Sequence, residues 1–180
     1  MMHGMVRDMP VTRVVSVDDV EALTDRVREN RAFLAPWEPV RDEAYFTVEG
    51  QRAVLEAQLD AYARGSMVPL VIVDEDDRPI GRVNLNNVVR GAFQSADLGY
   101  WVSESHTGRG IASAAVAEAV EVAFGRLGLH RLQAGTLLHN TASQRVLARN
   151  GFRPFAVAPS YLRIAGQWQD HVLYHLLAPS

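Results

Sequence analysis

The spacing of apolar residues alternates between two periods along the chain, and this alternation predicts strands separated by helices. Short apolar runs, or runs with the two-residue period of a strand, predict strands at 11–15, 67–73, 80–89, 97–102 and 131–138. Apolar residues at helical spacing predict helices from 18 or 19 to 30, at 45–64, at 111–127, and from 140 or 141 to 150. Two more strands are expected within 152–177, on the two sides of a turn at 164–167. The pattern favours an α/β fold with about six or seven strands.

Local signals set the expected boundaries and strand directions. Asp18 or Asp19 is expected to cap the first helix, which the prolines at 36 and 39 prevent from continuing. The polar turn 74–79 joins two predicted strands into an antiparallel hairpin, and we interpret its acidic residues as a solvated tip rather than a metal site. The strands 97–102 and 131–138 flank a helix, and this βαβ order predicts that they are parallel.

A glycine-containing loop opens the helix predicted at 111–127. The loop reads Thr107-Gly108-Arg109-Gly110 and leads directly into Ile111. Two glycines let a ligand approach the backbone closely, and the N–H groups of a first helical turn favour an anion. A phosphate group is therefore the expected ligand of this loop.

Composition and charge exclude several other kinds of site. The chain has 180 residues, which we interpret as one domain over 1–180 with flexible ends at 1–9 and 178–180. It contains no cysteine, which excludes disulfides, thiolate metal sites and a cysteine nucleophile. A net charge of -3 gives no reason to expect nucleic-acid binding. No apolar run has the length of a membrane span and no signal peptide is visible, so we expect a cytoplasmic protein with no membrane partner and no metal.

Residues 107–112 resemble the pyrophosphate-binding loop of GNAT-type N-acetyltransferases, whose pattern is Gln/Arg-x-x-Gly-x-Gly/Ala. Gly110 and Ala112 match this pattern, whereas Thr107 stands where Gln or Arg is usual. A second segment is similar to the family's next recognition segment, because Asn140 is followed eleven and twelve residues later by Gly151 and Phe152. The resemblance implies the GNAT (acyl-CoA N-acyltransferase) fold: a mixed, mostly antiparallel sheet, helices on both faces, and a splayed parallel strand pair at the cofactor.

Two residues of the second segment narrow the resemblance to the RimJ/RimL group of ribosomal-protein alanine N-acetyltransferases. Ser143 stands three residues after Asn140, and Leu147 occupies the position where the broad superfamily often has Tyr as an acid. The tail at 161–173 also resembles the C-terminal strand pair of the RimJ branch, and the whole similarity covers about 80–177. In that group the serine is thought to hydrogen-bond the coenzyme sulfur.

The resemblance implies a direct transfer from acetyl-CoA to a primary amine in a ternary complex. Ser143 would donate a hydrogen bond to the departing thiolate, and Asn140 would bind the pantetheine arm. The thioester carbonyl would lie against backbone N–H groups near Trp101, Val102 and Ser103. The diphosphate would be held by Thr107, Gly108, Arg109, Gly110, Ile111, Ala112 and Ser113.

The base that takes the amine proton is left open by the sequence. The RimJ/RimL group commonly carries a Glu three residues after the Gly-Phe phenylalanine, and this chain has Phe155 there. Glu104 could act as the base in place of this Glu. Alternatively, Glu104 is a loop carboxylate that faces solvent and takes no part in the reaction. The predicted acceptor groove is lined by Trp37, Tyr161, Trp168 and His171, each of which could instead serve packing alone.

The expected acceptor is a protein N-terminus, and a ribosomal protein is the one that the resemblance indicates. Without a strong base, an α-amine of pKa near 8 is easier to deprotonate at pH 7 than a lysine of pKa near 10.4. Two alternatives remain: acetylation of a small amine such as an aminoglycoside, a polyamine or an amino acid, and a CoA-binding interaction module without activity. The sequence is compatible with a monomer or a homodimer.

Overall fold

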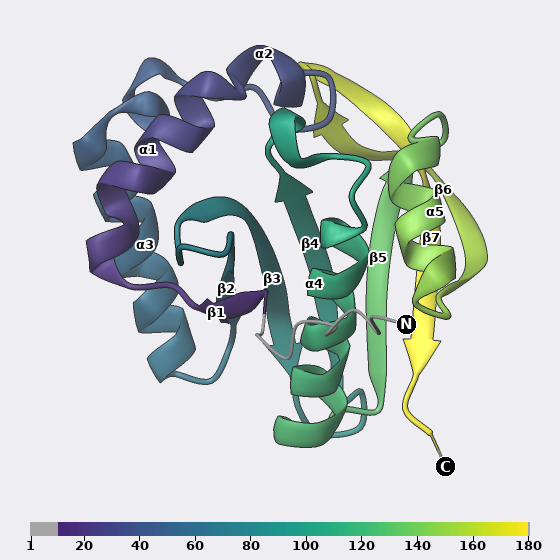
Figure 1. Ribbon diagram of the computed structural model, residues 1–180. Coiled ribbons are helices and arrows are strands. Elements are labelled where there is room, and N and C mark those ends of the chain that lie inside the picture. The colour runs from purple at the N-terminus through teal and green to yellow at the C-terminus, as the bar shows by residue number, and fades with distance from the viewer. Residues whose placement is uncertain (1–10, 180) are drawn as a thin grey trace, which may run out of the picture.

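Seven strands form one mixed sheet in the computed structural model, which describes residues 11–179 (Figure 1). The strands lie in the order β1-β2-β3-β4-β5-β7-β6, and every neighbouring pair is antiparallel except β4 and β5. Their bounds are β1 Thr12–Val14, β2 Val68–Val73, β3 Pro79–Val89, β4 Ser95–Val102, β5 Arg131–Leu137, β6 Arg153–Ile164 and β7 Gln167–Leu177. The predicted α/β class, hairpin and parallel pair are confirmed.

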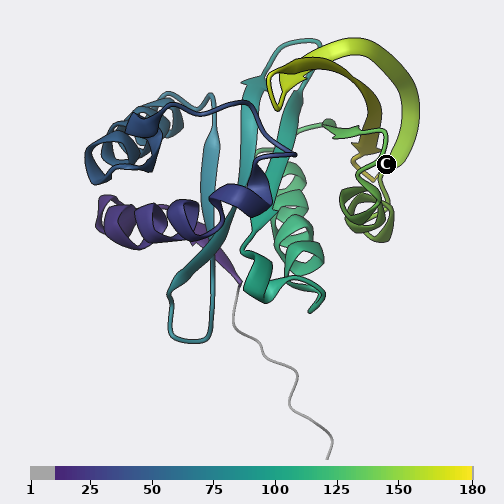
Figure 2. The same ribbon diagram turned by 90° about the horizontal axis from the view of Figure 1, so that it is seen from above.

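Helices cover both faces of this sheet, as the view from above shows (Figure 2). The α-helices are α1 Val20–Glu29, α2 Arg31–Leu34, α3 Val48–Ala63, α4 Ile111–Glu121 and α5 Thr141–Arg149. Short 3₁₀ turns are η1 Val17–Asp19, η2 Glu43–Phe46 and η3 Glu104–His106, and the π-helical turn is η4 Val122–Arg126. Helices α1 and α3 lie on one face, and α4 and α5 lie on the other.

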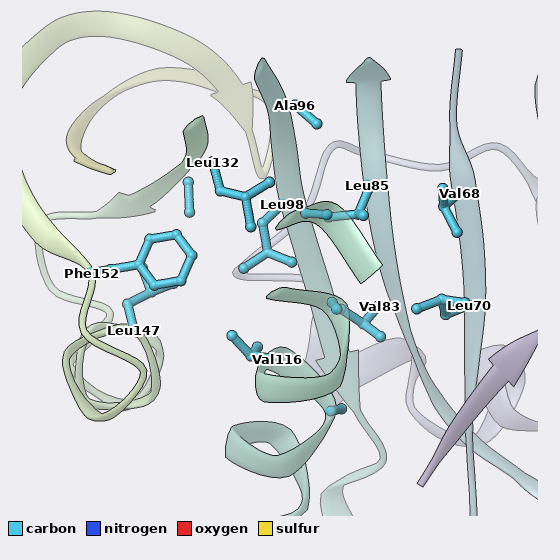
Figure 3. Packing of buried hydrophobic residues seen from close by; sticks show 14 of the residues in the cluster. Val68, Leu70, Val83, Leu85, Ala96, Leu98, Val116, Leu132, Leu147 and Phe152 are labelled. Carbon is cyan, nitrogen blue, oxygen red and sulfur yellow. The ribbon is translucent and has the colours of Figure 1, made fainter. Parts of the chain in front are cut away.

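Two hydrophobic clusters fill the space between the sheet and these helices. The larger joins strand residues such as Leu98 and Leu132 to Val116 of α4 and to Leu147 (Figure 3). The smaller packs α1 and α3 on Val71 of β2. Because β2 is buried on both faces, its sequence reads as an unbroken apolar run rather than an alternating one.

The parallel strands β4 and β5 separate after only three paired residues. Ser95–Asp97 of β4 pairs with Arg131–Gln133 of β5, and no pairing follows along the rest of the two strands. On the outer sides, β4 stays paired with β3 up to Val102, and β5 stays paired with β7 up to Leu137. The sheet therefore opens as a wedge toward the carboxyl ends of β4 and β5, as the resemblance implied.

Several predicted boundaries are wrong, and each difference has a capping residue behind it. The helix predicted at 45–64 begins at Val48, because Thr47 Oγ1 accepts a hydrogen bond from Gly50 N at 3.0 Å. Residues 43–46 form a separate turn with its own cap. The first helix keeps its predicted bounds, because Asp19 is the N-cap residue and Asn30 the C-cap residue of α1. Ser16 caps the 3₁₀ turn η1 before it, since its side chain accepts from Asp18 N.

The helices around the predicted phosphate loop also differ in detail. The α-helix predicted at 111–127 ends at Glu121 and continues as the π turn η4. Asn140 is the cap of α5, because its Oδ1 accepts from Ser143 N at 3.1 Å. Of the two predicted starts at 140 and 141, the helix itself therefore begins at Thr141.

The predicted flexible ends concern residues that the structure covers only in part. Residues 1–9 and 180 lie outside the described part of the chain. Within the described part, Ala178 N donates to His130 O at 2.9 Å, so the backbone is bound at this point. No helix in residues 11–179 is long and apolar enough to cross a bilayer.

Candidate active site

The loop between β4 and α4 presents backbone N–H groups at the mouth of the wedge. Gly108 and Gly110 have φ values of +73° and +77°, in the left-handed region that favours glycine. The first helical hydrogen bond runs from Ala114 N to Gly110 O at 3.0 Å, so the N–H groups of residues 111–113 precede the helical ladder. These donors and the positive end of the helix dipole fit a diphosphate.

The surroundings of this loop keep its outer side open. A Cβ at Gly108 or Gly110 would meet no atom within 4 Å, so conformation rather than crowding requires glycine there. Thr107 Oγ1 donates to Glu104 O at 2.8 Å, which fixes the start of the loop. Asn150 Nδ2 donates to Ser113 O and Oγ at 3.2 Å, and this contact ties α5 to the first turn of α4.

A buried hydroxyl without a partner lies on the β5 side of the wedge. Thr136 belongs to the part of β5 that is not paired with β4. By the two-residue period of a strand, its side chain points to the same face as Leu132 and Ala134, the face that packs against α4. Its Oγ1 is buried and has no hydrogen-bond partner among residues 11–179. An unpaired buried hydroxyl is costly, so a polar ligand in the wedge would satisfy it. The amide-rich pantetheine arm of coenzyme A fits this requirement.

Ser143 and Tyr100 meet across the other side of the wedge. Ser143 lies in the first turn of α5, and its Oγ is 2.8 Å from Tyr100 Oη. The Tyr100 hydroxyl also donates to Ser143 O at 3.1 Å. Burial raises the pKa of Tyr100 to about 12, so this phenol keeps its proton at physiological pH.

The predicted binding residues at the end of β4 are held in place by α1. Asn30, the C-cap of α1, donates from Nδ2 to Ser103 Oγ at 3.2 Å and accepts from Glu104 N at 2.8 Å. Trp101 and Val102 end β4 directly before these residues. The Glu104 side chain is exposed, so its predicted role as a base remains a prediction.

Three of the predicted groove residues lie at the turn and inner face of the β6–β7 pair. Tyr161 and His171 have ring centroids 5.5 Å apart, and a Cβ at Gly135 would contact both side chains. His171 is buried, and its Nδ1 lies 3.0 Å from Gln169 O. Trp168 is 66% exposed near the turn. The fourth, Trp37, packs on His139 with centroids 5.4 Å apart, at the carboxyl end of β5.

Phe155 lies at the opposite end of the sheet from these residues. Its ring stacks on His175 at 5.1 Å and lies under the guanidinium of Arg131 at 5.0 Å. Arg131 is the first residue of β5, whereas the wedge opens toward the last. Phe155 thus occupies an aromatic and cationic environment, and no carboxylate is available at this position.

A diphosphate loop at a helix start, beside a splayed parallel strand pair, defines the class of acyl-CoA-dependent acyltransferases. Residues 11–153 match the family model described as "Acetyltransferase (GNAT) domain". The chain belongs to this family, and it is an N-acetyltransferase that uses acetyl-CoA.

The relatives of this chain include enzymes that modify ribosomal proteins. It is 38% identical over 176 residues to the "[Ribosomal protein uS5]-alanine N-acetyltransferase" of Escherichia coli K12, covering 97% of this chain and 91% of the relative. The structure of "Mycobacterium smegmatis RimJ in complex with CoA-disulfide" superposes with a TM-score of 0.89 at 35% identity, covering 93% of this chain and 81% of that one. The ribosomal-protein-S5-alanine acetyltransferase of Vibrio fischeri gives 0.88 at 32% identity, with 92% and 91% covered.

Sequence reasoning missed the partners of the predicted residues. The sequence carries one signal for Tyr100: the two-residue period places it on one face of β4 with Leu98 and Val102, the face that packs with Leu147 of α5. Thr136 could also have been identified as a site residue, because it is a hydroxyl residue among the apolar residues of a buried strand. The contacts of Asn30 and Asn150 join elements distant in sequence, and no local pattern indicates them.

Proposed function

We propose that this enzyme acetylates the N-terminal α-amine of a ribosomal protein, with alanine as the first residue to test. The observation that carries the proposal is the similarity to RimJ enzymes over nearly the whole chain, at 38% identity for the Escherichia coli relative. Such an acceptor would place the enzyme in the cytoplasm.

Acetyl-CoA supplies an activated acetyl group as a thioester, and the chain's residues bind and orient it. The N–H groups of residues 110–113 would hold the diphosphate, with the helix dipole contributing about 0.3–1 kcal/mol. Thr136 and Asn140 would bind the amides of the pantetheine arm. The side chain of Asn140 caps α5 through Oδ1, and its Nδ2 has no hydrogen-bond partner among residues 11–179, so this group is available to a ligand.

Ser143 would assist the departure of the thiolate by donating its hydroxyl proton in a hydrogen bond to the sulfur. Tyr100 has one proton, and it can donate this proton to Ser143 Oγ at 2.8 Å in place of Ser143 O at 3.1 Å. In that arrangement the serine proton is free to point away from Tyr100. With a pKa of about 12, Tyr100 is too weak an acid to transfer its proton to a thiolate whose conjugate acid has a pKa near 8.5. It therefore acts as a fixed dipole, and Ser143 makes the contact with sulfur.

The absence of cysteine from the sequence excludes an acetyl-cysteine intermediate, which favours direct attack by the amine. Deprotonating an α-amine of pKa near 8 costs about 1.4 kcal/mol at pH 7, whereas a lysine of pKa near 10.4 costs about 4.6 kcal/mol. This difference of about 3 kcal/mol corresponds to roughly two orders of magnitude in rate. An N-terminal amine therefore needs a weaker base than a lysine side chain does, and it is the acceptor that suits this site.

The test is the release of the CoA thiol with a panel of acceptors. Peptides that begin with Ala, Ser or Thr are compared with the same peptides bearing an acetylated N-terminus and one internal lysine, and with polyamines and aminoglycosides. We expect the free N-terminal peptides to react fastest and Ser143→Ala to slow them. Equal or faster turnover of internal lysines or of a small amine would overturn the proposed acceptor.

A further inference from the structure

The segment from residue 30 to residue 38, which we term the crossing segment, spans the open end of the wedge. At one end Asn30 is bonded to Ser103 and Glu104, directly after β4. At the other end Trp37 packs on His139, directly after β5. Figure 1 shows α2, which forms residues 31–34 of this segment, between α1 and the turn of the β6–β7 pair. The crossing segment therefore joins the two carboxyl ends that the splayed sheet separates.

A second contact attaches the crossing segment to the turn between β6 and β7. Ala165 N donates to Glu38 O at 3.0 Å, and a Cβ at Gly166 would lie 3.6 Å from Val40 Cγ2. The segment follows α1, which lies on the face opposite α4. The diphosphate loop opens α4, so coenzyme and crossing segment approach the wedge from different faces. An acceptor entering from the second face would pass the crossing segment.

Glu38 is the acidic residue of this segment, and its carboxylate is poorly satisfied. The side chain is only 21% exposed, and its one ion pair is a long contact of 3.8 Å with Arg41 Nη2. No hydrogen bond reaches the carboxylate from residues 11–179. Burial raises the pKa of Glu38, which is the expected result when a carboxylate loses water without gaining donors.

We propose that Glu38 binds the ammonium group of the acceptor at the entrance to the wedge. An α-ammonium has three N–H donors and one positive charge, which supplies what this carboxylate lacks. The hydrogen bond from Ala165 N to Glu38 O and the packing of Trp37 on His139 fix the backbone from which the carboxylate extends. The inference rests on the proposed function, since it assigns a residue to the acceptor that the function requires.

The experiment separates ammonium binding from folding and from chemistry. An alanine-initiated peptide and its N-acetylated counterpart are each titrated calorimetrically into the full-length protein saturated with CoA. The variants are Glu38→Gln and the matched control Glu56→Gln, which removes an exposed carboxylate on the outer face of α3. CoA affinity and thermal unfolding are measured for every variant.

We expect the wild type and Glu56→Gln to bind the free peptide about tenfold or more tightly than the acetylated one, as is typical of a charge-assisted hydrogen bond. Glu38→Gln should reduce this ratio to about twofold while CoA affinity stays unchanged. A wild type that does not distinguish the two peptides overturns the inference without any variant. An unchanged ratio in Glu38→Gln, or a parallel loss of CoA affinity, also overturns it. If the inference about Glu38 fails in this way but the wild-type enzyme still acetylates the peptide, the proposed function stands. If the wild-type enzyme acetylates no peptide, both the inference and the proposed function are overturned.

Discussion

Replacing Tyr100 by Phe removes one hydroxyl from the site and leaves the ring in the core. Its Oη lies 2.8 Å from Ser143 Oγ and 3.1 Å from Ser143 O, so the substitution removes the partner that orients the serine hydroxyl. If Tyr100 acts only through Ser143, its loss must have no effect once Ser143 is gone. This dependence can be measured as a double-mutant cycle.

The expected magnitudes follow from the kinds of hydrogen bond involved. The Tyr100–Ser143 bond joins neutral groups and is worth about 0.5–1.5 kcal/mol, so Tyr100→Phe should lower kcat about 2- to 13-fold. Ser143→Ala would remove the proposed bond to a developing thiolate, which is worth about 1.5–3 kcal/mol, and should lower kcat about 13- to 160-fold. The double variant should match Ser143→Ala.

The assay is steady-state release of the CoA thiol, with acetyl-CoA and acceptor varied separately for the four proteins of the cycle. The KM for acetyl-CoA should stay within about threefold of the wild-type value throughout, because neither hydroxyl belongs to the proposed diphosphate site at residues 110–113. Independent effects of the two substitutions, which multiply in the double variant, would refute the idea that Tyr100 works through Ser143.

Three further predictions concern the loop and the stability of the fold. Gly110→Ala places an alanine in a left-handed backbone conformation, and it should weaken CoA binding at least fivefold by calorimetry. Gly125→Ala, at a position with ordinary φ, should not weaken it, and equal effects of the two substitutions would refute the role of the loop. The pKa of Tyr100 is raised to about 12 in the folded protein, so the stabilisation that its neutral form gives is present below pH 10 and is lost as pH rises toward 12. The free energy of chemical unfolding should fall by about 3 kcal/mol over this range, and Tyr100→Phe should not show this fall. Burial acts to raise the pKa of Asp19, but hydrogen bonds from Arg13 and from Ser16 N, together with the positive charge of Arg13, outweigh burial and lower the pKa. Asp19→Asn should therefore cost about 1.5–3 kcal/mol at pH 7, a difference that decreases as the pH falls below about 4, and exposed Asp18→Asn should cost little.

The parts of the fold that could be predicted are those encoded by neighbouring residues. Strand periodicity and the polar turn 74–79 identified the hairpin of β2 and β3, and chain order alone required β4 and β5 to be parallel. The glycine pair before Ile111 likewise identified the start of α4. The errors concern helix ends such as the start of α3, where Thr47 is the cap and apolar spacing does not distinguish a helix from an adjoining 3₁₀ turn.

The site was only partly predictable, because its remaining contacts join segments that are distant in sequence. Ser143 and Asn140 were identified through a family pattern, but Tyr100 is 43 residues away and becomes a partner only when α5 packs beside β4. In the sequence, Glu38 is simply a residue between the two prolines that end the first helical region. Its significance depends on the crossing of the wedge by residues 30–38, which is a property of the assembled sheet.

The most direct test of the account is a crystal structure of the protein with bound coenzyme A. We predict that the diphosphate oxygens lie within hydrogen-bond distance of the N–H groups of residues 110–113, and that the pantetheine arm enters between β4 and β5 with its sulfur beside Ser143 Oγ. A diphosphate bound elsewhere, or an arm that bypasses the gap between these two strands, would contradict the account.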